Sequence, residues 1–486
     1  MKRFLSLMLV VLLVLTLVGC GKNNKREIVE VTLSTEDAEA ILAAAGITLP
    51  AAEEVAVAGS TIKWYAWYDP FHNYSEAEIV NTGFFTFKEK YGCDVEWNEC
   101  VWDQRYDGLA NLVLAGTSPD FFPGDDIDYF PTYAIKGVFQ PVNDYIDYDD
   151  PLWSGTKDFV DTYLSLAGNR YAMIYDLKFD DVCAYNRRVI DEWGFDDPAE
   201  LYANDEWTWD EFYDMCLDFS DPDEERYALD GWFYDTSLME VGGGATVEYN
   251  LETHKFEANL DNPGLERAAE LLYNLRKNEC IYPVWDKGWT IRNGVEGGGI
   301  KDGLCLFYIV GTWAFTATVE EVNAVWGDIT QEEVMFVPLP RDPAGDGNYY
   351  IGTKIGAYLL VTGAQNPEGV ALFAACDRFK VLDPTVISVD RRQLMEKYFW
   401  TEEMLAMYDH CMDLSASENT VLNYGEGLGN QLFSIAIEKT MQLGRSGVGA
   451  QTWAQVKEAN EESIVFYVDD LNTKVDEYIA ILESEK

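Results

Sequence analysis

The stretch TIKWYAWYDP, residues 61–70, marks where the fold begins. Its apolar and aromatic side chains predict a strand, and Asp69 and Pro70 predict the turn that ends it. Alternation along this strand puts Trp64 on one face of a sheet and Trp67 on the other. From here strand-like segments alternate with helical segments, which is typical of an α/β fold with parallel, doubly wound sheets. The first segments are TIKWYAW, EAEIVNTGFFTFKEKYG, CDVEW and RYDGLANLVLAG.

A second alternating block, which begins near Asp181, indicates a second lobe of the same class. The chain of 486 residues is also longer than a single core usually serves. We therefore predict two lobes, each a doubly wound sheet flanked by helices, with crossings between them near residues 176–182 and 345–352. The expected lobes are residues 59–178 with 350–400, and residues 179–349 with 401–486, which include the C-terminal helices.

Residues 1–20 predict an export signal, because Lys2 and Arg3 precede an apolar run that closes in LVGC. The run is short for a spanning helix, which needs about 20 apolar residues. The residues around Cys20 resemble the lipobox of bacterial lipoproteins, in which the cysteine receives a diacylglyceryl group and becomes the first mature residue. The alternative is a cysteine that merely ends a signal segment. Residues 21–58 contain no aromatic side chain and predict a flexible tether with one transient helix in its Ala-rich part.

The charge of the chain excludes nucleic acid as a main partner. With 35 basic and 85 acidic residues, the formal net charge is −50, and the protein would repel a phosphate backbone. The same charge disfavours close contact with anionic lipids. Acyl chains, and not the protein surface, would therefore hold the protein at a membrane.

Eight cysteines follow Cys20, and their spacing argues against a disulfide framework. Cys93 and Cys100 bracket a strand-like segment, so they point to opposite faces of a sheet and lie roughly 23 Å apart. Other cysteines sit inside apolar stretches such as GLCLFYIV and ALFAACDRF. We expect most of them to be small buried hydrophobic residues.

Signatures of catalysis are mostly absent from the chain. Its three histidines, His72, His254 and His410, lie far apart and have no metal-ligand partner nearby in sequence. Acidic pairs such as Asp149 and Asp150 arise from composition alone among 85 acidic residues. We expect no catalytic residue, no metal site and no cofactor.

Aromatic side chains are the signal above this background, since the chain has 15 tryptophans and 29 tyrosines. The apolar C–H faces of a pyranose ring stack on indole and phenol rings, while carboxylates and amides bind its hydroxyl groups. Ligands of doubly wound sheets bind outside the carboxyl ends of the strands, which places Trp67 and Tyr68 nearest a sugar. We expect a core position for four other rings, Trp64, Tyr163, Trp326 and Trp453.

The residues YDGLANLVLAGTSPDFFPGDDIDYFPTYAIKGVFQPVNDYID (106–147) resemble the first-lobe segment of the extracellular sugar-binding proteins of ABC importers, the maltose-binding-protein-like group. Further blocks agree with this family in the right order, from about Thr61 to beyond Phe379. These blocks are CAYNRRVIDEWGFDDPAELYANDEWTWDEF, GGGATVEYN, GTWAF, VPLPRDPAGDG and AQNPEGVALF. The resemblance is specific because of their ordered set, and not because of any single block.

The resemblance implies a two-lobed protein of the type II periplasmic-binding-protein fold, which closes around a sugar and delivers it to a membrane permease. Trp313 matches the stacking tryptophan of the family, and Asp125 and Asp126 follow its SPD segment, where members often place a polar ligand contact. The implied ligand-binding residues are Trp67, Tyr68, Asp69, Asp125, Asp126, Trp232 and Trp313. The stretches WYAWYDPFHNYS and DLKFDDV depart from the maltose-binding pattern and leave the sugar open.

We therefore predict a monomeric, lipid-anchored, extracellular substrate-binding protein that captures a sugar or oligosaccharide and works with ABC permease subunits. The alternative is a surface-tethered carbohydrate-active enzyme, a glycoside hydrolase. A structural or adhesive surface protein has little support, because such proteins usually contain repeats. Incubation with oligosaccharides separates a binder from an enzyme, since only the enzyme returns shorter products.

Overall fold

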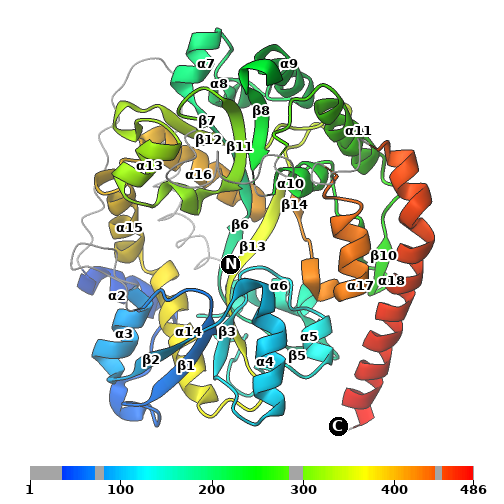
Figure 1. Ribbon diagram of the computed structural model, residues 1–486. Helices are drawn as coiled ribbons and strands as arrows, with labels where there is room; N and C mark the ends of the chain where they lie inside the picture. Colours follow the sequence, from blue (N-terminus) through cyan, green and yellow to red (C-terminus); the bar gives the residue numbers. More distant parts are fainter. Residues whose placement is uncertain (1–34, 72–81, 232, 284–298, 444–450, 485–486) are drawn as a thin grey trace.

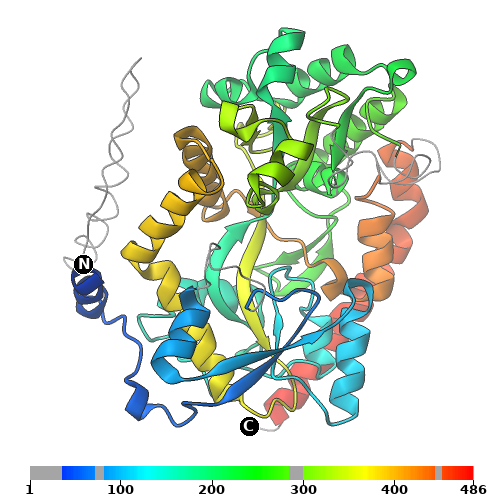
Figure 2. The same cartoon turned by 60° about the vertical axis from the view of Figure 1, so that its left-hand side comes forward.

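The structure is a computed structural model that describes residues 35–71, 82–231, 233–283, 299–443 and 451–484. Within these residues the chain forms two α/β lobes, and the strands β6 and β13 run between them (Figure 1). Figure 2 shows the same arrangement from another side, with β13 as the yellow strand at the centre. The predicted α/β architecture with two lobes is confirmed.

The first lobe is built on a six-stranded sheet with the order β14-β13-β3-β1-β2, in which β6 also pairs with β13. Helices α3 and α4 connect the parallel strands β1, β2 and β3. The strands are β1 (Thr61–Ala66), β2 (Asp94–Glu99), β3 (Phe121–Pro123), β6 (Met173–Phe179), β13 (Ile351–Leu360) and β14 (Thr420–Val421). The helices are α3 (Thr82–Tyr91), α4 (Arg105–Leu114), α5 (Thr132–Ile135), α6 (Lys157–Tyr163), α14 (Pro367–Leu382) and α15 (Pro384–Glu396).

The second lobe is built on a four-stranded sheet with the order β12-β7-β11-β8. Its strands are β7 (Asp181–Asn186), β8 (Tyr227–Gly231), β11 (Cys305–Gly311) and β12 (Val334–Val337), and a hairpin is formed by β9 (Val247–Asn250) and β10 (Lys255–Ala258). The helices are α7 (Arg187–Trp193), α8 (Pro198–Ala203), α9 (Trp209–Phe219), α10 (Tyr234–Glu240), α11 (Pro263–Lys277), α13 (Val319–Val325) and α16 (Glu402–Ser415).

The local sequence explains why these helices start where they do. Thr208 is the N-cap of α9, and its side chain accepts a hydrogen bond from the backbone N–H of Glu211. Thr318 and Glu321 form a reciprocal capping box at the start of α13. In both cases a side-chain oxygen satisfies a backbone donor that the helix itself leaves without a partner.

Both sheets are mixed, which corrects the prediction of parallel sheets. Strand β13 is antiparallel to β3 and β6, and β7 is antiparallel to β11 and β12. The reason is the path of the chain between the lobes. The strands β7 and β13 leave a crossing and run away from it, whereas their neighbours β11 and β3 run toward the crossing and end there.

The first of the two crossings between the lobes is very short. Strand β6 ends at Phe179 and β7 begins at Asp181, so Asp180 alone separates them. The backbone N–H of Asp180 donates to the carbonyl oxygen of Gly352, near the start of β13, at 2.9 Å. The return crossing consists of residues 338–350, between β12 and β13. Crossings this close together bring the ends of both sheets to one place in the molecule.

Part of the predicted tether is folded onto the first lobe. Helix α2 (Thr35–Ala44) contacts α15, and Leu42 and Ile47 are buried in the hydrophobic core. The hydroxyl of Tyr91 donates to the carbonyl oxygen of Pro50 at 2.8 Å. For residues 35–58 the prediction of a flexible tether is wrong, because apolar side chains of this segment are buried against the first lobe. Cys20 and the signal segment lie outside the described residues.

The predicted core residues are largely confirmed. Within the described residues the eight cysteines after Cys20 form no disulfide, and each of them except Cys100 is buried. Trp64, Trp326 and Trp453 are also buried. Tyr163 is only half-buried, because it lies at the end of α6, where it lines a pocket.

The long C-terminal helix α18 (Trp453–Ser484) packs along both lobes, at the right of Figure 1. It contacts β10 and α11 of the second lobe and α5 of the first. The hydroxyls of Tyr171 and Tyr478 are 2.9 Å apart, which ties the end of α18 to the first lobe. Within the described parts of the chain, no helix has both the length and the apolar character that a membrane crossing requires.

Candidate ligand-binding site

The end of β1 is held in place by buried aromatic side chains. The indole N–H of Trp64 donates to the carbonyl oxygen of Tyr68 at 3.2 Å, and that of Trp97 donates to the carbonyl oxygen of Ala66 at 3.0 Å. Trp64 packs on Phe121, whereas Trp67 packs on Phe122. Since Phe121 and Phe122 are neighbours in a strand, Trp64 and Trp67 face opposite sides of the sheet, as predicted.

Trp67, Tyr68 and Asp69 follow directly after β1, and all three are half-buried. The hydroxyl of Tyr68 donates to Oδ2 of Asp125 at 3.2 Å, so the first and third strands meet here through these side chains. Burial and the nearby Asp125 raise the pKa of Tyr68 well above its usual value, which keeps it a neutral donor. Oδ1 of Asp69 accepts from the backbone N–H of Phe71 at 2.9 Å and thereby stabilises the turn.

Asp125 and Asp126 follow β3, and a lysine on β13 connects them to the crossing. The Nζ of Lys354 lies 3.1 Å from Oδ1 of Asp126 and 3.0 Å from Oδ1 of Asp180. Burial lowers the pKa of Lys354, but Asp126 and Asp180 raise it by more, so the amine stays charged. Burial and the neighbouring Asp126 raise the pKa of Asp125. One cation thus holds together carboxylates from the first lobe and the crossing.

Trp313 lies in the second lobe, directly after the end of β11 that is beside the crossing. Strand β11 ends at Gly311, which pairs with Asp181, the first residue of β7. A Cβ atom on Gly311 would lie 2.4 Å from Nε1 of Trp313, so the indole rests against a backbone that only glycine allows. The ring is 52% exposed, whereas Phe315 in the same turn is fully buried. The sequence predicted this exposed position after an apolar strand.

Further carboxylates surround this edge. The hydroxyl of Ser237 donates to Oδ2 of Asp181 at 2.8 Å, and the amide of Asn423 donates to Oε1 of Glu240 at 2.9 Å. Burial and the nearby Asp180 raise the pKa of Glu240 to about 8. A Cβ atom at position 352 would approach Oε2 of Glu240 to 2.8 Å, which explains the glycine there. The crossing is therefore a crowded acidic region with one central lysine.

Trp102 is an exposed aromatic residue beside the site that the sequence-based prediction missed. It follows β2, and its ring centroid lies 4.4 Å from that of Trp67, with the two planes at 87°. Arg105 packs on its ring, and this arginine is itself buried against Asp128 and Glu426. The signal was present in the sequence, since Trp102 follows a predicted strand just as Trp67 does.

The structure brings some predicted site residues together and leaves others apart. Tyr68, Asp125 and Asp126 lie in one group of the first lobe, together with Trp67 and Asp69. Trp313 lies on the second lobe. Trp232, like His72, lies outside the described residues. Asp149 and Asp150, which were not predicted to bind a ligand, lie elsewhere on the first lobe. There Asp149 pairs with Lys157.

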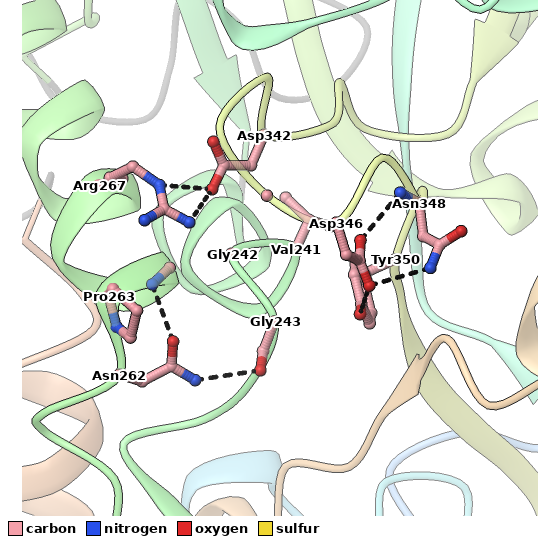
Figure 3. A pocket seen from close by; sticks show the side chains of 12 residues that line it. Val241, Gly242, Gly243, Asn262, Pro263, Arg267, Asp342, Asp346, Asn348 and Tyr350 are labelled. Carbon is pink, nitrogen blue, oxygen red and sulfur yellow. Dashed lines mark hydrogen bonds and ion pairs between the residues drawn. The ribbon is translucent and has the colours of Figure 1, made fainter.

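A separate pocket of about 220 Å³ lies where α10 ends and α11 begins, and none of the predicted site residues lines it (Figure 3). Arg267 binds Asp342 with two nitrogens at its wall, at 2.7 and 2.6 Å. Asp346 on the other side accepts from the Tyr350 hydroxyl at 2.8 Å. The polar groups of this pocket are therefore paired with one another.

Comparison with known proteins agrees with the fold. The family model described as bacterial extracellular solute-binding protein matches residues 67–376, which is more than half of the chain. None of the curated proteins matches this chain. An ABC substrate-binding protein from Listeria monocytogenes, in complex with cycloalternan, is 15% identical with a TM-score of 0.58, over 83% of this chain and 98% of that one.

Other solved structures are similar to the same extent. The GacH receptor of Streptomyces glaucescens, studied unliganded and with acarbose, is 15% identical with a TM-score of 0.57, over 84% of this chain and 98% of that one. The galacto-N-biose-/lacto-N-biose I-binding protein of Bifidobacterium longum, in complex with lacto-N-biose, is 14% identical with a TM-score of 0.57, over 85% of this chain and 97% of that one.

At such identities the solved structures establish the fold, while the family model establishes membership. Two α/β lobes joined by adjacent crossings are the architecture of a type II periplasmic-binding protein, and the ordered sequence blocks from Thr61 onward agree with it. The chain therefore belongs to the bacterial extracellular solute-binding proteins.

Proposed function

We propose that this protein captures a sugar or oligosaccharide between its two lobes and delivers it to the permease of an ABC importer. One observation carries the proposal: in each lobe an indole follows a strand that ends beside the crossing, where carboxylates gather. On the first lobe the half-buried Trp67 precedes Tyr68, whose hydroxyl donates to Asp125, and on the second lobe the exposed Trp313 follows Gly311, which pairs with Asp181. Rings stack on the apolar faces of a pyranose, and carboxylates accept from its hydroxyl groups.

The roles of the side chains follow from their chemistry. Trp67 and Trp313 would stack on the sugar from opposite lobes, while Asp125 and Asp126 would accept hydrogen bonds from its hydroxyls. Tyr68 would orient Asp125 through its hydroxyl, and Asp69 would shape the turn that positions Trp67. Trp232 is retained as a contact from the second lobe on the resemblance alone.

Binding would close the lobes by a hinge at Asp180 and residues 338–350, with each lobe moving as a rigid body. Residues 401–486 were expected in the second lobe, but β14 (Thr420–Val421) pairs with β13 in the first-lobe sheet. In this proposal the lobes are residues 59–178 with 350–400 and β14, and residues 179–349 with the rest of 401–486. Lys354 bonds Asp126 of the first lobe and Asp180 of the hinge itself, so it would hold the hinge against the first lobe while the outer parts move.

The similar solved proteins support a carbohydrate ligand. Their ligands are cycloalternan, acarbose and lacto-N-biose, which are all saccharides or saccharide-like molecules. The three proteins are described as binding proteins or receptors, and this favours a binder over a glycoside hydrolase.

Small-angle scattering tests the proposed function. The protein would first be screened on a glycan array, and its radius of gyration would then be measured with and without the best glycan at saturation. We expect a smaller radius with the glycan, because closure brings the lobes together. No binding to any glycan, or no compaction with a bound one, would contradict the proposal. Recovery of shortened glycan would favour the surface-tethered glycoside hydrolase.

We propose further that the protein acts as a monomer on the outer face of the cell membrane, anchored by acyl chains at Cys20. The lipobox-like residues and the polar segment after Cys20 support this anchor. Cys20→Ala should leave the precursor without lipid and move the protein out of the membrane fraction, since acyl chains would be its main attachment. Cell fractionation followed by immunoblotting measures the shift, and Cys100→Ala serves as the control. Unchanged membrane retention of Cys20→Ala would count against the anchor.

A further inference from the structure

The C-terminal part of α18 is bound to both lobes at positions that are close together. On the side of the second lobe, the side-chain amide of Asn472 makes two hydrogen bonds with the backbone of Phe256 in β10. The N–H of Phe256 donates to Oδ1 at 2.9 Å, and Nδ2 donates to its carbonyl oxygen at 2.8 Å. Lys255 of the same strand forms an ion pair with Asp476. Residues 472–476 of α18 are therefore fixed to the second lobe.

The next turn of α18 contacts the first lobe. The hydroxyl of Tyr478 lies 2.9 Å from that of Tyr171, which is fully buried in the first lobe just before β6. Ile479 and Leu482 are half-buried against the hydrophobic core. Asn472 and Tyr478 are six positions apart, which is about 9 Å along a helix. A helical segment this short transmits a movement of the second lobe directly to Tyr478.

The contact between the two tyrosines lies far from the hinge. Tyr171 is nine positions before Asp180, and β6 fills most of this interval as an extended strand. At about 3.3 Å per residue, Tyr171 is about 30 Å from the hinge residue. A rotation of about 10° that tilts one rigid lobe against the other would displace a point at this distance by about 5 Å. The hydrogen bond would not survive such a displacement, because it needs a separation of about 3 Å.

We propose that the contact of Tyr478 with Tyr171 is a latch that stabilises the arrangement of the lobes described above and opposes their closure around a ligand. This inference rests on the proposed function, because it takes the ligand-driven hinge closure as given. In the closed state Asn472 keeps α18 on the second lobe, and Tyr478 separates from Tyr171. Ligand binding must supply the free energy of this separation, so the latch lowers the affinity.

Calorimetric titration of the full chain tests the latch, and the probe is the glycan that binds the parent best on an array of mono- and oligosaccharides. Tyr478→Phe removes one hydroxyl and keeps the ring. It should bind this glycan about 2- to 10-fold more tightly than the parent, because closure no longer breaks a hydrogen bond. Tyr171→Phe should have the same effect. The double variant should gain no more than either single variant, since both remove the same bond.

Tyr467→Phe is the matched control on the same helix. Tyr467 is half-buried, and among the described residues its hydroxyl has no hydrogen-bond partner, so this variant should bind the glycan as the parent does. An affinity of Tyr478→Phe that equals that of the parent, or falls below it, overturns the latch and leaves sugar binding intact. A parent that binds no glycan, or that binds one without compaction in scattering, contradicts the proposed function itself.

Discussion

Arg105→Met is expected to lower the free energy of unfolding by about 3 to 5 kcal/mol. The substitution removes the cation of a buried ion pair and leaves its carboxylate partners without a counter-charge. The guanidinium is 3% exposed and bonds Asp128, as well as Oε1 of Glu426 at 3.1 Å. Burial lowers the pKa of Arg105, but Asp128 and its other neighbours raise it by more. Methionine fills much of the same volume, so the expected loss is due to charge.

Chemical denaturation followed by tryptophan fluorescence measures this loss. The matched control is Arg391→Met, because Arg391 forms an ion pair with Asp409 on the surface of α15, where 44% of its side chain is exposed. Exposed pairs contribute about 0 to 1 kcal/mol, so the control should remain close to the parent. Equal stability of both variants and the parent would show that the Arg105 cluster contributes nothing to the fold.

Trp313→Ala is expected to weaken sugar binding about 5- to 150-fold, which corresponds to roughly 1 to 3 kcal/mol of lost stacking. The reason is its position, since the half-exposed ring ends an otherwise buried strand and rests on the backbone of Gly311. The loss should affect mono- and oligosaccharides alike, because Trp313 lies beside the crossing.

Calorimetry and thermal melting on the same variants separate binding from stability. Trp326 is the matched control, because it lies in the same lobe but is buried, packing edge-on against Phe315 and Tyr308. Trp326→Ala should cost about 3 to 5 kcal/mol of stability, as truncation of a core tryptophan typically does, whereas Trp313→Ala should cost much less. If Trp313→Ala unfolds the protein, or binds sugar as tightly as the parent, the assignment of this ring to the site fails.

The sequence by itself determined the first strand at Thr61, the α/β class, the two lobes and the family. It also predicted that Trp313 is exposed and that Trp64 and Trp67 lie on opposite faces. These properties are local, because alternation of apolar side chains and the position of turn residues depend on near neighbours along the chain. A family resemblance likewise needs only an ordered set of short segments.

Tertiary structure alone decided which distant side chains meet. Arg105 bonds Glu426 across 321 positions, and Lys354 bonds Asp180 across 174. No local pattern predicts such pairs, because their energy comes from packing and burial that exist only once both lobes are assembled. The same holds for the antiparallel direction of β13 and for the folding of residues 35–58 onto the first lobe. It also holds for Trp102, which lies next to Trp67 only because β2 lies beside β1.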